Sequence, residues 1–414
     1  MTIKSSSEMT ADRRIENPRM RVLQLLRQKG PLAKIQIAGE LAISPALAGL
    51  ICKEFLQMGV VTVAGTGESA GGRRPTLLQL NELSNVVVGC DLGVTHVTSV
   101  LTNLHGRVIE RCRIETDPRD DSGTTLRHIQ ESIQDVISRA GLPTASILGI
   151  GLSVPGLIDL PVGVSVLAPN LPNWKNIPIV RLVKESFGIP VSIINDAWAL
   201  ALGEHWFGAG RGHQDLVAVN IGHGIGAGII LDGRLYSRGI GGCGEIGHVT
   251  VNENGPRCPC GSNGCLELMA SGPAISARAI QAISSAVPTS LETLSGGHPL
   301  KVNARMVAEA ADRGDDVATA ILADAGRYVG IAVAMVVNLL SPEMVILGGG
   351  VARSGAAFFD VVCATVERRA YTTIVNKPEI VLSELEDDAS VLGAVALVLE
   401  RAFRSPGSLF RTSA

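Results

Sequence analysis

The sequence predicts an α/β protein built from a small N-terminal domain of three helices and a β-wing, followed by a larger domain of two related lobes. Two observations predict this division. Residues 19–80 hold short stretches with helical apolar spacing and then two strand-like segments. Farther along, 86–109 and 216–236 share an apolar strand, a glycine-rich turn, a second apolar strand and a turn ending in Gly-Arg. A repeat of this length indicates a duplicated domain.

The N-terminal elements follow from local patterns. Ser44 is a good N-cap, and Pro45 suits the first position of a helix that we expect to end at Gly59. Three helices and then two strands are expected in the order 19–29, 34–42, 45–59, 60–65 and 76–80. This order is typical of a winged helix-turn-helix; a small helical cap on the larger domain is the alternative.

The charge of the chain is uneven. The first 80 residues carry 11 Lys or Arg against 6 Asp or Glu, whereas the whole chain has a net charge of −3. A basic head on an acidic body indicates that the head alone meets an anionic partner. The overall charge argues against a protein that coats nucleic acid throughout.

The duplicated region sets the expected domain limits. Two related lobes usually enclose a cleft, where ligands prefer to bind. A strand running into three glycines within 341–355 allows close backbone approach there. We expect an N-terminal domain with its linker at 1–82, a first lobe at 83–204 and a second lobe at 205–388. A C-terminal helix at 389–404 is expected to complete the first lobe.

The first residues and the apolar runs of the chain indicate in which cellular compartment the protein is expected. Residues 1–14 lack the apolar core of a signal peptide, and the longest unbroken apolar run, 330–337, is far short of the ~20 residues that span a bilayer. We therefore expect a cytoplasmic protein that does not enter a membrane. A stable disulfide is disfavoured in that compartment.

Three cysteines crowd into the stretch RCPCGSNGCLE at 257–267. A disulfide, a reactive thiol pair and a metal site are the competing explanations. The set His248, Cys258, Cys260 and Cys265 supplies one imidazole and three thiolates, which is a recognised ligand set for structural zinc. Four protein ligands leave no position for a catalytic water, so we expect one structural zinc per chain. Free core cysteines beside an unrelated histidine are the alternative.

The segment GEIGHVTVNENGPRCPCGSNGCLE, 244–267, closely resembles the signature of the ROK family of repressors, open reading frames and sugar kinases. Blocks at 153–159, 168–174 and 194–210 are similar to family blocks in family order. The resemblance implies a two-lobed actin–hexokinase fold. The leading winged helix is a feature of the regulator branch, which implies a homodimer or homotetramer that binds operator DNA and a sugar or sugar phosphate.

The resemblance also implies a set of sugar-binding residues. The family's positions fall on Asn195, Asp196, Glu245, His248 and Glu267 here, with Asn170 as a further candidate. Carboxylates can accept hydrogen bonds from adjacent sugar hydroxyls. His248 would bind zinc through one ring nitrogen and offer the other to a hydroxyl. Each residue also has an ordinary explanation, since Asn195 and Asp196 could simply cap a helix and Glu245 could be a surface charge.

The resemblance leaves a regulator and a kinase as alternatives. An ATP-dependent sugar kinase with an appended N-terminal domain would use Asp196 as its general base. Family kinases have glycine and a small hydroxyl residue in their two phosphate turns, where this chain has Val94 and His223. Two such changes make ATP an unlikely cofactor and favour the regulator. A third alternative is a DNA-tethered module whose lobes bind a protein.

The expected DNA contacts lie on the third helix and in the wing turn. Ser44 and Lys53 are polar side chains of the helix, and Arg73 and Arg74 stand in the turn. Ala48 and Gly49 occupy positions where regulators of this type usually carry Ser and Arg. We therefore expect strong phosphate binding and modest base readout.

Overall fold

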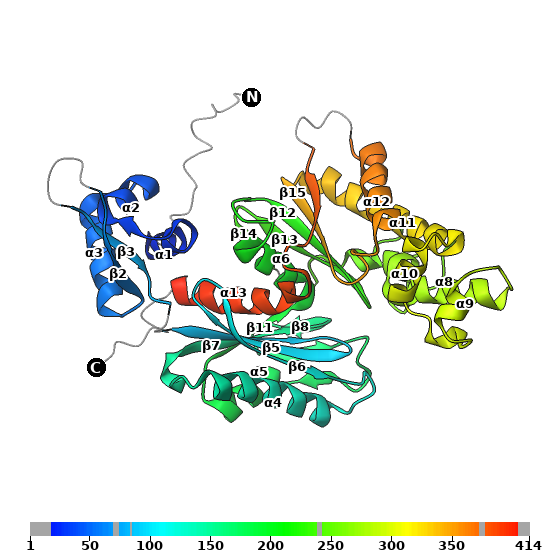
Figure 1. Ribbon diagram of the computed structural model, residues 1–414, viewed down its shortest axis with the longest axis horizontal. Helices are drawn as coiled ribbons and strands as arrows, with labels where there is room; N and C mark the ends of the chain where they lie inside the picture. Colours follow the sequence, from blue (N-terminus) through cyan, green and yellow to red (C-terminus); the bar gives the residue numbers. More distant parts are fainter. Residues whose placement is uncertain (1–17, 69–73, 83–84, 238–241, 372–376, 405–414) are drawn as a thin grey trace, which may run out of the picture.

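The computed structural model of the protein describes residues 18–68, 74–82, 85–237, 242–371 and 377–404 (Figure 1). The N-terminal unit holds the three expected helices and both expected strands: α1 (Pro18–Lys29), α2 (Lys34–Leu41), α3 (Pro45–Gln57), β2 (Val61–Thr66) and β3 (Thr76–Leu80). A third strand, β1 (Leu32–Ala33), pairs with β3, so the sheet order is β1-β3-β2. Two residues are too few to show the alternation that marks a strand in a sequence.

The third helix begins where its capping residues predict. The Ser44 Oγ accepts a hydrogen bond from the Leu47 backbone N–H, and Pro45 occupies the first turn. The helix ends at Gln57, and Gly59 follows with a φ of +70°. Ala48, Ile51, Cys52 and Phe55 form its buried face. The N-terminal unit thus has its own apolar core.

The first lobe contains a five-stranded sheet of order β11-β7-β4-β5-β6. Its strands are β4 (Val86–Leu92), β5 (His96–Asn103), β6 (Val108–Glu115), β7 (Ile147–Val154) and β11 (Val191–Asn195). The helices α4 (Ser122–Ala140) and α5 (Ile179–Phe187) accompany it, with the short helix η1 (Thr144–Ser146). A small antiparallel sheet adds β8 (Leu157–Asp159), β9 (Val164–Leu167) and β10 (Lys175–Ile177).

The second lobe repeats this sheet. Its strands are β12 (Leu216–Ile221), β13 (Ile225–Leu231), β14 (Arg234–Leu235), β15 (Met344–Gly348) and β16 (Glu379–Leu382). In each lobe the first three strands form an antiparallel meander, and two further strands then add in parallel beside the first. The duplication expected from 86–109 and 216–236 is therefore present in the topology.

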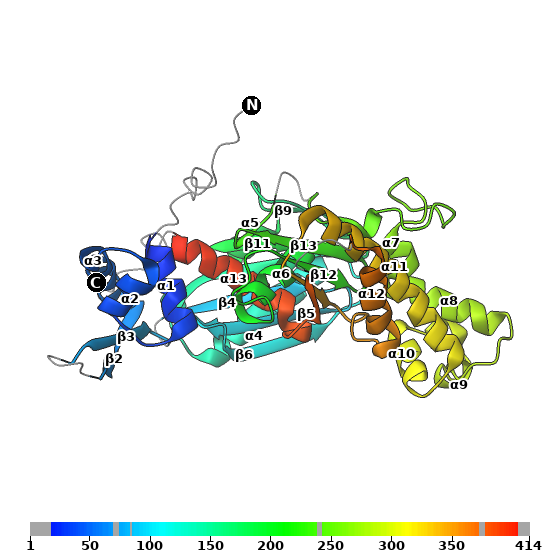
Figure 2. The ribbon, with the colours of Figure 1, turned by 90° about the horizontal axis from the view of Figure 1, so that it is seen from above.

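Helices cover the outer end of the second lobe (Figures 1 and 2). They are α7 (Leu266–Ala270), α8 (Gly272–Ser284), α9 (Leu291–Leu294), α10 (Ala304–Asp312), α11 (Asp316–Leu340) and α12 (Ala356–Arg369), with η2 (Ile246–His248) and η3 (Pro299–Lys301). By length and composition, α11 alone among the described helices could cross a membrane. Of its apolar window 72% is buried inside the protein, which is the pattern of a core helix.

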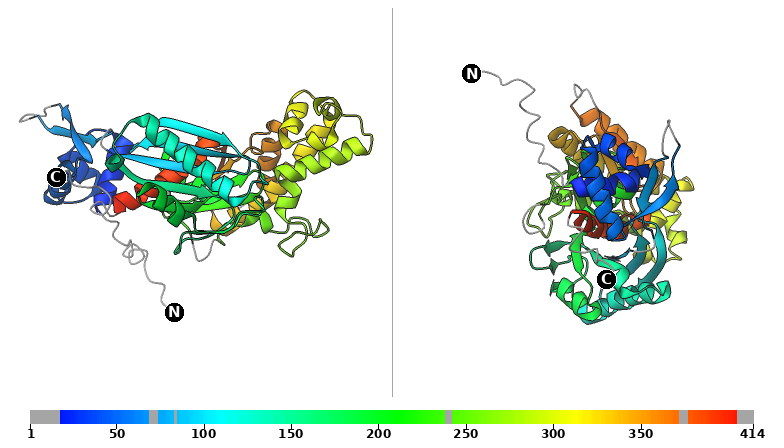
Figure 3. Two further views of the ribbon diagram at one scale, coloured as in Figure 1. Left: turned by 90° about the horizontal axis from the view of Figure 1, so that it is seen from below. Right: turned by 90° about the vertical axis from the view of Figure 1, so that its left-hand side faces the viewer.

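Two helices form the layer between the lobes: α6 (Asp196–Phe207) packs on β12 and β13, and α13 (Ala389–Arg404) packs on β4 and β7. Glycines let α6 and α13 approach closely, since a Cβ on Gly393 would lie 1.8 Å from the Ala199 carbonyl oxygen. The C-terminal helix thus lies on the first-lobe sheet (Figure 3). This layer places the N-terminus of α6 between the two sheets.

Candidate functional site

The four expected metal ligands converge in one cluster. The ligand atoms of His248, Cys258, Cys260 and Cys265 all lie within 4.8 Å of one another. The Cys258 Sγ lies 3.7 Å from the His248 Nδ1, and the Cys260 Sγ lies 3.6 Å from the Cys265 Sγ. Four ligands at zinc bonding distances of about 2.0–2.3 Å would be separated by about 3.3–3.8 Å at the corners of a tetrahedron. The cluster therefore has the dimensions of a tetrahedral metal site.

The same distances exclude a disulfide here. A disulfide needs its sulfurs about 2.05 Å apart, whereas all eight cysteines are free. Cys258 and Cys265 are buried and Cys260 is exposed. Because the His248 Nδ1 faces the sulfurs, its Nε2 is left for another partner. No ion is part of the structure, and the donor set fits one.

The metal loop connects directly to a candidate ligand residue. Cys265 immediately precedes α7, and Glu267 lies in the first turn of that helix. The Glu267 Oε2 accepts a hydrogen bond of 3.0 Å from the Ile225 backbone N–H. A Cβ on Gly224 would lie 2.7 Å from this oxygen and 3.5 Å from the Asn170 Nδ2, so both side chains flank the turn that precedes β13.

Carboxylates of both lobes interact at this point. The pKa of Glu245 is raised by burial, with His248 lowering it and Glu267 raising it further. The pKa of Asp196 is raised to about 7 by burial first and then by the charges of Asp91 and Glu245. The structure thus brings Asp196, Glu245 and Glu267 within electrostatic range of each other. Clustered carboxylates with raised pKa values are a common sign of a ligand site.

Asp91 and Asn220, which lie in the repeated segments 86–109 and 216–236, also belong to this cluster. The Asn220 Nδ2 donates a 3.3 Å hydrogen bond to the Asp196 Oδ2. Burial raises the pKa of Asp91 to about 6, and Ser153 partly opposes the shift. The two residues occupy matching positions near the ends of β4 and β12. Their matching positions in the repeated segments were the available signal, since matching strands end at corresponding places in the two sheets.

Asn195 serves mainly as a cap. Its Oδ1 accepts hydrogen bonds from the Ala197 and Trp198 backbone N–H groups at 2.9 and 3.3 Å. Its Nδ2 donates to the Gly156 carbonyl oxygen at 2.9 Å. One amide N–H remains for a ligand, so Asn195 chiefly fixes where α6 begins and therefore where Asp196 points.

The two glycine-rich turns face each other with a histidine each. A Cβ on Gly93 would lie 3.2 Å from the His96 Cε1, so the His96 ring packs against the turn that holds Val94. Burial lowers the pKa of His96, and His223 is among the further charges that lower it. Burial also lowers the pKa of His223. Imidazole rings thus lie at both turns that would have to approach nucleotide phosphates.

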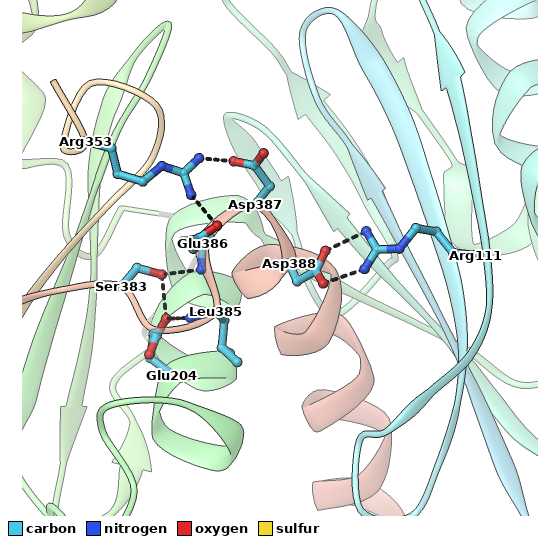
Figure 4. Close-up of polar contacts among 8 residues, drawn as sticks. All are labelled: Arg111, Glu204, Arg353, Ser383, Leu385, Glu386, Asp387 and Asp388. Carbon is cyan, nitrogen blue, oxygen red and sulfur yellow. Dashed lines mark hydrogen bonds and ion pairs between the residues drawn. The ribbon is translucent and has the colours of Figure 1, made fainter. Parts of the chain in front are cut away.

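An acidic turn links the two lobes (Figure 4). In η4 (Glu386–Asp388), Asp387 pairs with Arg353 of the second lobe and Asp388 pairs with Arg111 on β6 of the first lobe. The turn is anchored on α6, where the buried Glu204 accepts hydrogen bonds from Ser383 and the Leu385 N–H. The pair between Arg111 and Asp388 crosses between the lobes and depends on their relative position.

The expected DNA contacts differ in their surroundings. Ser44, Lys53 and Arg74 are exposed, and Arg73 lies outside the described residues. Ala48 is fully buried in the apolar core of its own unit and is not available to contact DNA. The exposed face of α3 instead carries Ala46, Leu50 and Lys53. Leu50 is 59% exposed, which fits apolar contact with thymine methyl groups better than hydrogen-bonded readout.

The raised pKa of Asp196 gives a testable pH dependence. A buried carboxyl with a raised pKa favours the folded state while protonated, and that contribution is lost as pH rises from about 4 through about 7. Asp196→Asn cannot ionise. We therefore expect the melting temperature of the unliganded variant, minus that of the wild type, to increase between pH 5 and pH 8. A constant difference across this range would contradict the buried, raised carboxyl.

The sequence of this chain is similar to one protein family and to characterised members of it. The family model described as ROK family matches residues 87–401. The chain is 34% identical over 380 residues to a xylose repressor of Caldicellulosiruptor bescii, covering 91% of this chain and 94% of the relative. It is 35% identical over 315 residues to a glucokinase of Thermotoga maritima, covering 76% of this chain and 98% of the kinase.

A solved structure agrees over nearly the whole chain. It is described as a ROK family transcriptional regulator, homolog of the Escherichia coli MLC protein, and superposes with a TM-score of 0.80 at 29% identity. The match covers 93% of this chain and 96% of that structure. The regulators therefore share the N-terminal unit as well as the two lobes, whereas the kinase similarity is shorter by about the length of that unit.

Proposed function

The chain belongs to the ROK family, and on that premise we propose that it is a sugar-responsive transcriptional repressor. Its N-terminal unit binds operator DNA, and a sugar or sugar phosphate binds between the lobes. The observation that carries the proposal is the extent of similarity, because the xylose repressor matches 91% of the chain and the glucokinase 76%. The protein would act in the cytoplasm, where operator DNA is accessible.

The N-terminal unit has the parts of a winged helix-turn-helix. In this proposal α2 and α3 form the helix pair and β2 and β3 form the wing. Lys53 on α3 and Arg74, two residues before β3, would contact phosphates, and Ser44 and Arg73 are proposed as further DNA contacts. A homodimer, or a homotetramer built from such dimers, would place two of these units on half-sites one or more helical turns apart.

The interlobe cleft supplies the sugar site of the proposal. Glu245 and Glu267 would accept hydrogen bonds from sugar hydroxyls, Asp196 would accept a further one, and the free nitrogen of His248 would bind another. Asn170 and the remaining N–H of Asn195 would complete the set. A structural zinc held by His248 and the three cysteines would fix these groups without taking part in chemistry.

Sugar binding can alter DNA affinity only by favouring one arrangement of the lobes. The ion pairs of the acidic turn join Arg353 and Arg111 across the lobes and are partly exposed. Such pairs contribute only about 0–1 kcal/mol each. The sugar can therefore rearrange them at little cost, and a coupling of about 1–3 kcal/mol would change operator affinity roughly 5- to 150-fold.

A DNA-binding titration tests the proposal. Labelled DNA from the region upstream of the protein's own gene is titrated at several salt concentrations, with and without xylose, glucose or N-acetylglucosamine. We expect binding that weakens with salt and a change of affinity with one sugar. Absence of retardation at low salt would overturn DNA binding, and retardation that no saccharide changes would favour a protein ligand for the lobes.

A single lysine tests the orientation of α3. Lys53→Ala should weaken DNA binding and lower the slope of log affinity against log salt by about 1, because one phosphate contact is lost. Lys301→Ala is the matched control, since Lys301 is an exposed lysine on η3 of the second lobe. Equal slopes for the two variants would argue that α3 does not face the backbone of DNA.

The kinase alternative rests on the glucokinase similarity and on the position of Asp196. We expect sugar-dependent ADP release to stay at background with hexoses and amino sugars, because His96 packs on the first turn and His223 stands in the second. The Thermotoga maritima glucokinase serves as the positive control. Release well above background would overturn the preference for a regulator without sugar kinase activity.

A further inference from the structure

A cavity of about 630 Å³ lies where the N-terminal unit meets the two-lobed body. Helices α1 and α13 pack together beside it (Figure 2). Its lining comes from α1, the β5–β6 turn, the end of α6 with the segment that follows it, and α13 with the segment leading into it. The volume falls within the range of about 300–1,000 Å³ typical of small-molecule sites. This cavity is separate from the carboxylate cluster of the interlobe cleft.

The lining is positively charged. Three arginines from three segments reach it: Arg27 on α1, Arg107 in the β5–β6 turn and Arg211 after α6. His105 is also part of the lining, and none of the described lining residues is Asp or Glu. Nearby acids are partly engaged, since Glu384 pairs with Arg211 at 3.3 Å and Glu82 lies 3.9 Å from His105.

Arg27 is the most enclosed of the three. Its guanidinium carbon lies 4.5 Å from the ring centroid of Trp206 and 5.3 Å from that of Phe207. Its Nη1 donates a 2.7 Å hydrogen bond to the Trp206 carbonyl oxygen. Its Nε is inaccessible to solvent and has no hydrogen-bond partner among the described residues. Stacking on aromatic rings offsets part of the cost of burying this cation.

The positive charges of Arg27 and Arg211 repel each other in this cavity. Burial, and then the charge of Arg211, lower the pKa of Arg27 to about 10. The turn is built for close approach, since a Cβ on Gly106 would lie 2.5 Å from the Phe207 ring. Anion binding would relieve the repulsion, and arginine matches phosphate oxygens through two parallel hydrogen bonds.

We propose that this junction cavity is a second ligand site, which binds a small phosphate ester between α1 and the two-lobed body. The arginines hold the phosphate group. The organic part lies against Phe207, Leu385 and Leu392, which supply the apolar portion of the lining. A cavity of this size leaves room beside one phosphate group. The bound ester bridges Arg27 of the N-terminal unit and Arg107 of the first lobe.

Calorimetric titration of the full chain tests the site without DNA. The probes are glucose 6-phosphate, glucose and inorganic phosphate. We expect one ester bound per chain, with affinity at least about tenfold weaker in Arg107→Glu, because a carboxylate would then face the phosphate. Arg107 is exposed and has no ion pair among the described residues, so this variant should fold. Arg305→Glu, the same charge change on the exposed face of α10, should bind like the wild type.

Different results would overturn the site. Equal ester affinity in Arg107→Glu and the wild type would overturn it, as would absence of ester binding. Inorganic phosphate that binds as tightly as the ester would overturn the role of the organic part. Ester binding lost in Glu245→Gln but kept in Arg107→Glu would move the ligand to the interlobe cleft, which would leave the proposed function standing.

Discussion

Cys265→Ser should lose both the bound zinc and the saccharide response. Zinc content measured on purified protein should fall from about one per chain to a small fraction, because a hydroxyl replaces a buried thiolate ligand. Sugar affinity should fall by at least about 100-fold. The metal loop is close to Glu267 in the chain, because Cys265 directly precedes α7. The Leu266 N–H also donates to the Val249 carbonyl oxygen at 2.9 Å, so the loop sets the direction of Glu267.

The control for this experiment is Cys363→Ser. Cys363 is a half-buried cysteine on α12, outside the metal cluster, so its variant should keep both zinc and saccharide binding. Retained DNA binding by Cys265→Ser would show that the N-terminal unit is still folded. A zinc-free Cys265→Ser variant that still responded normally to saccharides would contradict the role of the metal loop.

Glu245→Gln should weaken saccharide binding by about 10- to 100-fold. Hydrogen bonds to a charged group contribute about 1.5–3 kcal/mol, and the substitution removes the charge while keeping the shape. The Glu245 carboxylate has no hydrogen-bond partner among the described residues and lies near His248 and Glu267, so a ligand is the available donor. Calorimetric or thermal-shift titration with the responsive sugar measures the effect.

Glu253→Gln is the matched control. It makes the same charge change at an exposed position eight residues farther along the chain. Its sugar affinity should equal that of the wild type. Similar losses in both variants would indicate a general effect of charge on the fold, and no loss in Glu245→Gln would remove this residue from the site.

Local patterns explain why parts of the fold could be predicted. The cap at Ser44 depends on one hydrogen bond to a residue three positions away, and the strand and helix periods lie within single elements. The four metal ligands lie within 18 residues, so a short loop can bring them together wherever it stands in the fold. The burial of Ala48 could not be predicted from the local pattern, because it depends on how α3 packs on its neighbours.

The cleft required information from distant parts of the chain. Asn220 reaches Asp196 across 24 positions, the Asn195 amide reaches Gly156 across 39, and Arg111 reaches Asp388 across 277. No periodic pattern in the sequence indicates that residues this far apart in the chain come into contact. The same holds for Arg27, whose hydrogen bond to the Trp206 carbonyl oxygen spans 179 positions.

By itself the sequence determined the order of the elements, the duplicated lobes and the thiolate-rich loop, because backbone preference and ligand spacing act over a few residues. Only the tertiary structure decided which carboxylates lie together and where three arginines meet. Those outcomes depend on burial and on charges brought together through space, and neither quantity exists until the sheets and helices have packed.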